Sequence, residues 1–376
     1  MNIKLCYNFI MKKYAYNHNP IPFDFEQTTD RFFVEEIPLF KFTGTGNNLI
    51  LKIKKQDMST WKLINVISKA TGLAERDIGY AGLKDKNATT IQYISIPKTA
   101  ERELVNLTTD KIKILEKTYN KSPIKIGHLK GNKFSIKLYG VSEKGAKDIS
   151  RIAHKLGTNG IPNYFGYQRF GEDSRSHLQG KKIAESGKKL KGAKEKLLVA
   201  SYQSYLFNNW LSQRVNLSST ISNLSIKDAS ETLSYPEPLV KALSIEPQFF
   251  KLFIGDMMIS YPYGKIEFVK DMSYSSKLFS EKKLSPTGLL CGSHAKRSQS
   301  DAYYLEEPFD DSELNALKGD RRFAWIWIED IFTKYKENSR ELIIDFYLPK
   351  GSYATTFLEE LGKKELKPMK SIKELD

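Results

Sequence analysis

The stretch from Gly79 to Pro97 places a dense polar group between two apolar runs. The polar group is Lys84-Asp85-Lys86-Asn87, and the runs on either side are typical of short strands. A carboxylate in such a loop can act as a nucleophile without a cofactor, and the neighbouring lysines favour its ionised form. Charged loops between strands are also often only solvated turns, so residue types alone leave both interpretations of Asp85 open. Gln92, in the second run, adds an amide that could read a polar ligand edge.

A second candidate group lies between Gly127 and Leu138. Gly131-Asn132 has the composition of a turn, and Phe134 begins an alternating strand with Ile136 and Leu138 on the same face. Asn132 and Phe134 could supply an amide and an aromatic platform for a base. Equally, Asn132 could only hold a turn and Phe134 could only fill the core.

The segment Ile161 to Gly171 interleaves aromatic residues with Arg169 and glycine, a composition that fits base stacking and phosphate contact. An aromatic-filled domain junction would have the same composition. A lysine-rich run over 181–196 fits either a surface that follows a phosphate backbone or a solvated helix face. The residues that we predict to bind RNA are Tyr164, Arg169, Lys181, Lys182, Lys188 and Lys189.

The composition favours a polyanionic partner. The 376 residues carry a formal net charge of +15, with 12% aromatic residues, which indicates nucleic acid. The two cysteines and five histidines have no metal-ligand spacing, so we expect neither a metal nor a disulfide. No phosphate-binding glycine loop or serine nucleophile motif is present. No apolar run approaches membrane-spanning length and the start of the chain does not read as a signal peptide, so we expect a cytoplasmic protein with reduced thiols. We expect it to be a monomer.

The apolar periodicity predicts strands over 31–55 and a helix that begins at Ser59 or Thr60 and ends at Gly72. It predicts a second helix from Ser142 to Gly157 and, near the end of the chain, further strands and a capped helix. The middle of the chain is more basic and more helical. We therefore expect a sheet-based domain split by an insertion, with the last strands returning to the first sheet.

The motif "AGLKDKNATTIQ" resembles the signature of the TruD family of tRNA pseudouridine synthases, close to G-x-K-D-[KR]-x-A-x-T-x-Q. The segments "RFFVEEI", "LKGNKF", "PNYFGYQRFG", "SYQSYLFN" and "LPKGSYATTFLEEL" resemble other motifs of the family, in order, over about residues 20–362. One departure is Asn48, which stands where the family usually has histidine, and it puts any role of that histidine in doubt.

The resemblance implies an α+β fold: a mixed, largely antiparallel-sheet synthase domain interrupted by an inserted α/β TRUD domain. The domains would be a flexible N-terminal extension (1–19), a split catalytic domain (20–160 and 325–376) and the insertion (161–324), which would contribute to RNA binding. Whether residues 1–10 are translated is left open, because Met11 could also start the chain.

The resemblance also implies an isomerase that converts a uridine of tRNA, typically U13, to pseudouridine without cofactor or metal. Asp85 would be the nucleophile, with Lys84 beside it, Asn132 and Phe134 lining the pocket and Tyr353 closing it. The alternatives are a non-catalytic tRNA-binding protein or RNA chaperone, and a different RNA-modifying enzyme such as a methyltransferase, for which no cofactor loop is legible.

Overall fold

The computed structural model describes residues 12–171, 173–188, 190 and 192–366 of the chain. The helices are α1 (Thr60–Thr71), α2 (Glu143–Asn159), α3 (Ser176–Glu185), α4 (Gly192–Asn223), α5 (Ile226–Leu233), α6 (Glu237–Ser244), α7 (Met272–Ser280), α8 (Ser300–Glu306) and α9 (Ala354–Gly362). The strands are β1 (Phe32–Pro38), β2 (Asn48–Gln56), β3 (Gly79–Tyr80), β4 (Thr89–Pro97), β5 (Ile112–Asn120), β6 (Leu129–Leu138), β7 (Ile161–Pro162), β8 (Met257–Ser260), β9 (Ile266–Phe268), β10 (Leu284–Leu290), β11 (Asp320–Phe323), β12 (Trp325–Ile326), β13 (Glu329–Lys336) and β14 (Glu341–Pro349). The fold is α+β, as predicted.

The contacts between residues divide the chain into two units. Unit 1 comprises Met1–Pro20, Thr158–Trp327 and Ser352–Asp376, and unit 2 comprises Ile21–Gly157 and Ile328–Gly351. These units group α9 and the N-terminal segment with the insertion, whereas the predicted catalytic domain included α9. As functional domains, the boundaries at 160 and 325 stay a prediction.

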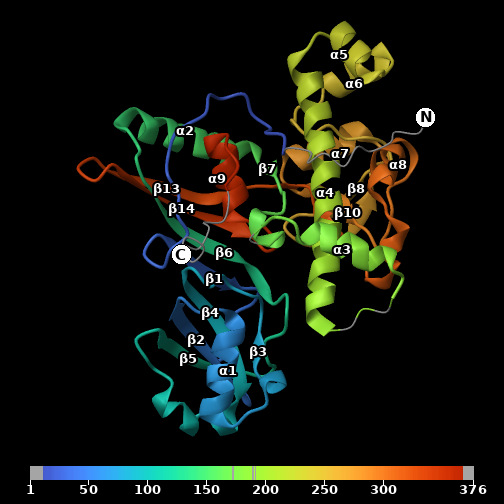
Figure 1. Ribbon diagram of the computed structural model, residues 1–376. Helices are drawn as coiled ribbons and strands as arrows, with labels where there is room; N and C mark the ends of the chain where they lie inside the picture. Colours follow the sequence, from blue (N-terminus) through green and yellow to red (C-terminus); the bar gives the residue numbers. More distant parts are fainter. Residues whose placement is uncertain (1–11, 172, 189, 191, 367–376) are drawn as a thin grey trace, which may run out of the picture. The chain divides into compact units, whose positions relative to one another are not determined.

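The large sheet of unit 2 has the strand order β13-β14-β6-β1-β4-β2-β5, and β3 pairs with β4 (Figure 1). Its pairings are antiparallel except for the parallel pair β1 and β4. The last strands, β13 and β14, join the sheet through β6, far from them in the sequence. Long-range pairing of this kind brings the loop after β3 and the strand β6 into one unit.

Helix α1 covers β2 and β4 on one face of this sheet (Figure 1). It begins as predicted: the side chain of Ser59 accepts a hydrogen bond from the backbone N–H of Lys62 at 3.2 Å. Gly72 ends it in the left-handed conformation, with φ 71°. The apolar face of α1 and the alternating residues of β2 form a buried core, and Tyr80 of β3 packs against it.

Helix α2 continues past its predicted end. Gly157 lies inside the helix, and Gly160 follows it with φ 80°. An added Cβ on Gly157 would meet Ile331 Cδ1 at 2.7 Å and the carbonyl oxygen of Ile328 at 2.9 Å. The glycine is therefore needed for close packing against the chain around β13, and not for termination of the helix.

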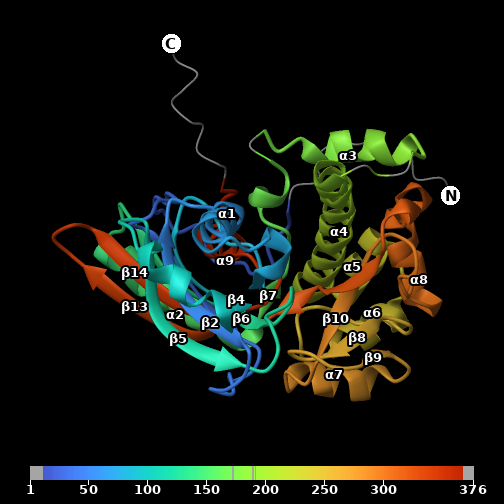
Figure 2. The same ribbon diagram turned by 90° about the horizontal axis from the view of Figure 1, so that it is seen from below.

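Unit 1 is built on the long helix α4. Figure 2 shows α3 across the N-terminal end of α4, and Figure 1 shows α5 and α6 at its other end. A small sheet, of order β11-β10-β8-β9, packs against α4, and its pairings are antiparallel. The insertion was predicted as α/β, but antiparallel pairing makes it α+β too. The terminal helix α9 lacks the predicted side-chain cap, since Tyr353 at its start makes no capping hydrogen bond.

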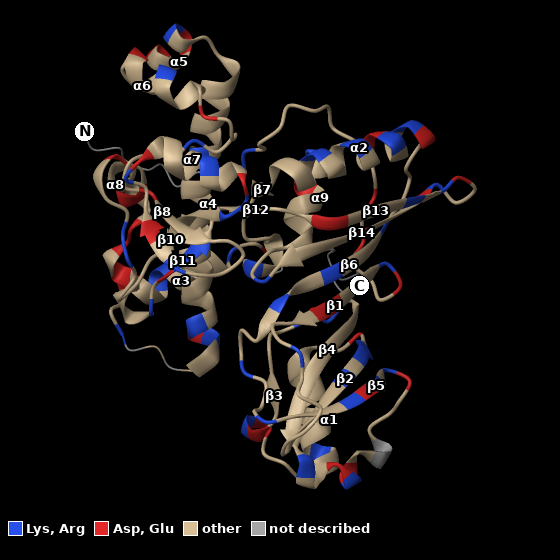
Figure 3. Ribbon diagram, turned by 180° about the vertical axis from the view of Figure 1, so that it is seen from behind, with Lys and Arg blue, Asp and Glu red and all other residues tan. Residues whose placement is uncertain are grey.

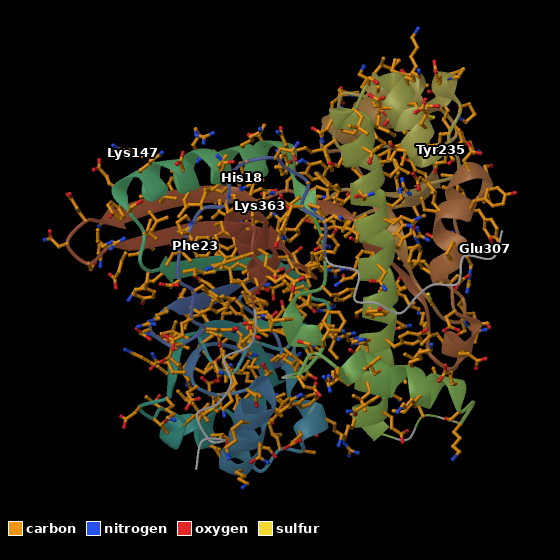
Figure 4. The ribbon with its side chains drawn as sticks, turned by 45° about the horizontal axis from the view of Figure 1, so that its top comes forward. His18, Phe23, Lys147, Tyr235, Glu307 and Lys363 are labelled. Atoms are coloured by element: carbon orange, nitrogen blue, oxygen red, sulfur yellow. The ribbon has the colours of Figure 1, made fainter. Side chains whose placement is uncertain are left out.

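The described part of the predicted flexible extension, residues 12–19, is bound to α9. The backbone N–H of Ala15 donates to the Glu360 carboxylate at 3.1 Å, and His18 Nε2 lies 3.0 Å from the carbonyl oxygen of Leu361. Figure 4 labels His18 and also Lys363, which follows α9 and contacts Glu360 at 2.5 Å. These contacts satisfy buried carboxylates, and the flexibility of the extension stays a prediction. Residues 1–11 lie outside the described part.

None of the helices described here has both the length and the apolar composition needed to span a membrane. Over the residues that the structure describes, no three His, Cys, Asp or Glu side chains are grouped as a metal site would require.

Candidate active site

The candidate nucleophile lies in the loop between β3 and β4. Two hydrogen bonds hold this loop: the backbone N–H of Lys84 donates to Thr60 Oγ1 at 2.9 Å, and Lys55 Nζ donates to the carbonyl oxygen of Asp85 at 3.3 Å. Thr60 begins α1, and Lys55 lies near the end of β2. The loop is therefore fastened on both sides of Asp85 by groups from other elements.

The pairing of the strands places the other predicted residues on one face of the sheet. Phe134 of β6 lies opposite Val34 of β1, Val34 opposite Thr90 of β4, and Thr90 opposite Lys55 of β2. Directly paired residues project their side chains to the same side. Phe134 therefore shares its face with Lys55, whose ammonium group reaches the Asp85 loop.

Two residues further along the strands, a second row of paired side chains lies on the same face of the sheet. Asn132 of β6 is paired with Glu36 of β1, and Gln92 of β4 is paired with Ile53 of β2. Because side chains two residues apart along a strand share a face, Asn132 and Gln92 lie on the side of Phe134 and Lys55. Of the residues predicted around Asp85, Gln92, Asn132 and Phe134 are thus gathered on one face of the sheet.

Lys84 makes a buried ion pair instead of lying free beside the nucleophile. Its Nζ is 2.6 Å from Glu36 Oε2, and the two side chains are 5% and 1% exposed. The sequence reasoning did not find Glu36, although it lies in phase with the buried residues Phe32 and Val34 of β1. The pair fixes Lys84 on the sheet, where its charge lowers the pKa of Asp85.

Lys55 was also missed, and it is completely buried. Besides Asp85, its ammonium group donates to the carbonyl oxygen of Met58. Burial lowers the pKa of Lys55 to about 8, against the opposing charge of Asp85. The alternation of β2 could have found it, since Lys55 follows Leu49, Leu51 and Ile53 on the apolar face.

The electrostatics of Asp85 differ from the sequence expectation. Burial of the carboxyl group raises its pKa, while Lys55, Lys84 and a hydrogen bond from Gln27 lower it, and the net direction is upward. The residue as a whole is nevertheless exposed. Both properties fit a carboxyl group that is surrounded by protein atoms while other parts of the residue are exposed to water. Lysine charges alone therefore do not set its ionisation.

Phe134 and Asn132 differ in their surroundings. The Phe134 ring is 7% exposed, stacks on Phe346 at 5.3 Å and meets Phe32 edge-on at 6.0 Å. This supports the core interpretation, and base stacking by Phe134 stays a prediction. Asn132 Oδ1 is buried and accepts no hydrogen bond from the described residues. An amide oxygen in that state is ready to accept a donor from a ligand.

Gln92 is a fully buried support of the loop. Thr60 Oγ1 donates to Gln92 Oε1 at 3.1 Å and accepts from the backbone N–H of Lys84. The three residues form a continuous chain of hydrogen bonds from β4 to the loop. This arrangement favours positioning of the loop over direct contact of Gln92 with a substrate.

Tyr353 belongs to unit 1, where it lies in an aromatic and basic cluster. Its ring is 5.9 Å from the ring of Phe165 and 5.9 Å from the guanidinium carbon of Arg322. Arg322 lies 3.9 Å above Phe165, and burial lowers its pKa to about 10. Arg169, predicted to bind RNA, lies 5.5 Å above the same ring and donates to Ser204 Oγ at 2.9 Å. A role for Tyr353 at the pocket stays a prediction.

The other predicted RNA contacts are of two kinds. Tyr164 is 4% exposed and donates to the carbonyl oxygen of Lys13, so its burial argues against stacking on a base. Lys182 and Lys188 are exposed, and Lys181 is 3.5 Å from Glu185. Lys189 lies outside the described residues. The surface lysines remain available to a polyanion.

Asn48, the residue that departs from the family pattern, has a structural contact. Its Nδ2 donates to the carbonyl oxygen of Lys121 at 3.0 Å and thereby helps to hold β2 near the end of β5. Asn48 therefore has a role in the sheet that does not involve the Asp85 loop.

Comparisons with known proteins cover nearly the whole chain. A family model described as tRNA pseudouridine synthase D (TruD) matches residues 9–193. The tRNA pseudouridine synthase D of Nitratiruptor sp. is 44% identical over 352 residues, covering 93% of this chain and 98% of that protein. That of Sulfurimonas denitrificans is 43% identical, covering 94% of this chain and 99% of that protein.

A crystal structure from Methanosarcina mazei, of a protein assigned to tRNA pseudouridine synthase D, has the same fold with a TM-score of 0.67. The two chains are 20% identical, and the match covers 94% of this chain and 96% of that one. Fold and sequence together place the chain in the class of pseudouridine synthases. Within that class, it belongs to the TruD family of tRNA pseudouridine synthases.

Proposed function

We propose that this chain is an isomerase that converts a uridine of tRNA, at position 13, to pseudouridine, with Asp85 as nucleophile and without a cofactor. Membership of the TruD family supports the reaction and the substrate class. The observation that carries the assignment of Asp85 is its position: a recessed carboxyl group with two buried lysines beside it.

The reaction is an isomerisation, so its atoms balance within the nucleoside. The carboxylate of Asp85 attacks either C1′ of the ribose or C6 of the uracil, and the bond between C1′ and N1 breaks. The base rotates, C1′ bonds to C5, the proton on C5 is released and N1 gains a proton. If Asp85 attacked C1′, its bond to C1′ breaks as C1′ bonds to C5; if it attacked C6, its bond to C6 breaks after C1′ has bonded to C5. Either cleavage regenerates the carboxylate.

The surrounding residues suit this chemistry in distinct ways. Lys55 and Lys84 supply positive charge that favours the ionised nucleophile against the cost of burial. Asn132 Oδ1 can accept a hydrogen bond from a donor on the uracil edge. The target nucleotide has to leave its helical stack to reach Asp85, which costs about a few kcal/mol. Contacts to neighbouring parts of the RNA have to offset that cost.

The charge of the chain supports a phosphate-rich substrate. Figure 3 shows Lys and Arg segments on α2 of unit 2 and on α4 of unit 1, and the formal net charge is +15. Such a surface attracts RNA irrespective of sequence, and its contribution weakens as salt is raised. Charge alone fits the competing function as well, namely a protein that binds tRNA without modifying it.

Release of tritium from tRNA transcribed with [5-³H]uridine tests the proposal. We expect the wild-type protein to release tritium and Asp85→Asn to release none, with tRNA binding kept in both. Asp77→Asn, at another exposed carboxylate of unit 2, is the matched control and should turn over normally. Normal turnover by Asp85→Asn would exclude the nucleophile, and a wild-type protein that binds tRNA without release would favour the non-catalytic function.

A further inference from the structure

The Asp85 loop has an exposed aromatic side chain next to it that the mechanism does not use. Trp61, the second residue of α1, is 56% exposed, and its ring meets Tyr80 edge-on with centroids 5.7 Å apart. Leu83, on the loop itself, is 59% exposed. Single exposed apolar residues are common on protein surfaces, but these lie together beside a candidate active site.

The hydrogen bond between Thr60 and Lys84 brings Trp61 close to the nucleophile. Trp61 follows Thr60 and Asp85 follows Lys84, so each is one residue from a contact of 2.9 Å. Neighbouring Cα atoms are about 3.8 Å apart, so the backbones of Trp61 and Asp85 lie near each other at this contact. Thr60 is also held by Gln92, which fastens this end of α1 to the sheet.

The charge around Trp61 suits RNA. Lys62, the next residue of α1, and Lys86, in the Asp85 loop, are both exposed, and the first turn of α1 contains no acidic residue. The N-terminal end of a helix adds partial positive charge there. An aromatic face among cationic groups is the arrangement that binds unpaired bases, because the ring stacks while the cations contact the backbone.

From these observations we infer that Trp61 stacks on an unpaired base of the substrate RNA, next to the uridine that Asp85 attacks. Once the target leaves the helix, its neighbour loses a stacking partner, and the indole ring replaces it. Tyr80 supports the indole from its edge, and Lys62 and Lys86 contact the flanking phosphates. The inference rests on the proposed function for its substrate, but it concerns binding and not the chemical step.

Fluorescence gives a test that is independent of catalysis. The chain has four tryptophans, and Trp210, Trp325 and Trp327 are 3%, 1% and 3% exposed. Trp61 therefore dominates the emission that a solvent quencher can reach. In the Asp85→Asn protein, titration with unmodified tRNA transcript should quench this emission and protect it from acrylamide. In the same protein carrying Trp61→Phe, that response should be absent.

Steady-state kinetics provide the second readout. We expect Trp61→Ala to raise KM for tRNA on the order of tenfold while kcat changes less than twofold, and Trp61→Phe to recover most of the loss. The control is Phe332→Ala, because Phe332 is 68% exposed and lies on the other face of the sheet from Phe134. Its face follows from the strand pairing: Phe332 is opposite Asp345, and Asp345 is opposite Ser135, the neighbour of Phe134. This variant should keep the wild-type KM.

Three results would overturn the inference. They are a Trp61 emission that tRNA leaves unchanged, a KM for Trp61→Ala equal to that of the wild type, and a change of oligomeric state in Trp61→Ala without RNA. The last would mean that the ring packs against a second copy of the chain. Quenching is measured in the Asp85→Asn protein, which we expect to bind tRNA without reacting. A failure of Trp61 stacking can therefore be told apart from a failure of the Asp85 mechanism, which tritium release measures.

Discussion

The ammonium group of Lys55 lies 3.3 Å from the backbone carbonyl oxygen of Asp85, in a site where Lys55 has no exposed surface. A buried lysine is costly unless its donors are satisfied, and these go to Met58 and to the candidate nucleophile's own backbone. The contact therefore joins the end of β2 to the Asp85 loop and places a positive charge beside the carboxyl group.

Substitution of Lys55 should separate activity from stability. We expect Lys55→Met to lower kcat at least tenfold, because the loop loses an anchor and Asp85 loses a charge that favours its ionised form. The free energy of unfolding at pH 7 should stay equal or rise. Burial lowers the pKa of Lys55, and each unit of that shift means that the charged lysine costs the folded state about 1.4 kcal/mol. Urea unfolding and tritium release on the same preparations check this. Lys54→Met, on the neighbouring residue of β2, is the control.

The stability of the protein should depend on pH through Lys55. In the folded state its pKa is about 8, below its unfolded value of 10.5, so between these values the unfolded chain holds more protons. The free energy of unfolding should therefore rise with pH across that window. Lys55→Met should flatten the rise. A pH series of urea midpoints that is identical in both proteins would contradict the burial of a titrating lysine.

The pH profile of turnover should have two limbs. Asp85 has to be ionised to attack, and its pKa is raised, so kcat should increase with pH through a range above that of an ordinary aspartate. Above about pH 8, Lys55 loses its proton and its charge, and kcat should fall. Single-turnover tritium release between pH 5 and 9.5 measures both limbs. An alkaline limb that persists unchanged in Lys55→Met would assign it to another group.

Breaking the buried ion pair should destabilise unit 2. Glu36→Gln leaves the Lys84 ammonium, 5% exposed, without its carboxylate at 2.6 Å, which should cost about 3–5 kcal/mol. The double variant Glu36→Gln with Lys84→Met removes both charges and should recover part of that loss. Chemical unfolding of the wild type, the two single variants and the double variant tests the coupling. Additive effects of the two substitutions would show that the pair contributes no interaction energy.

Asn132 should matter for turnover more than for folding. Its buried Oδ1 makes no hydrogen bond to described residues, so Asn132→Ala should leave the unfolding midpoint nearly unchanged. Loss of a hydrogen bond to the uracil should lower kcat/KM roughly tenfold. Asn87→Ala, at an exposed position of the Asp85 loop, is the matched control. Equal activity of the two variants would remove Asn132 from the proposed pocket.

Affinity for tRNA should fall steeply with salt. If Lys182 and Lys188, both exposed, each contact a phosphate, replacing both with Ala should reduce the slope of log Kd against log salt by roughly two. Filter binding between 50 and 300 mM KCl measures the slope. A slope unchanged by the substitutions would place the phosphate contacts elsewhere on the protein.

Local pattern by itself predicted much of the fold. The alternation in β2 and β4, the capped helix α1 and the strands near the end of the chain are all encoded by neighbouring residues. The charged loop around Asp85 was identified for the same reason, since turn composition between two strands is a local property. The end of α2 was mispredicted because Gly157 is a glycine for close packing against Ile331 and not for ending the helix. Ile331 is distant in the sequence, so no local pattern reveals this contact.

The sequence therefore determined the elements, the family and the candidate nucleophile, while the tertiary structure decided what surrounds that nucleophile. By residue type Glu36 and Lys55 resemble solvated charges, but their phase in β1 and β2 is that of buried residues, and both are buried in the folded sheet. For Phe134 the residues left platform and core open, and the ring lies mostly in the core. The physical reason is the same in each case: burial and pairing depend on residues distant in the chain, and they set the charge and access of the site.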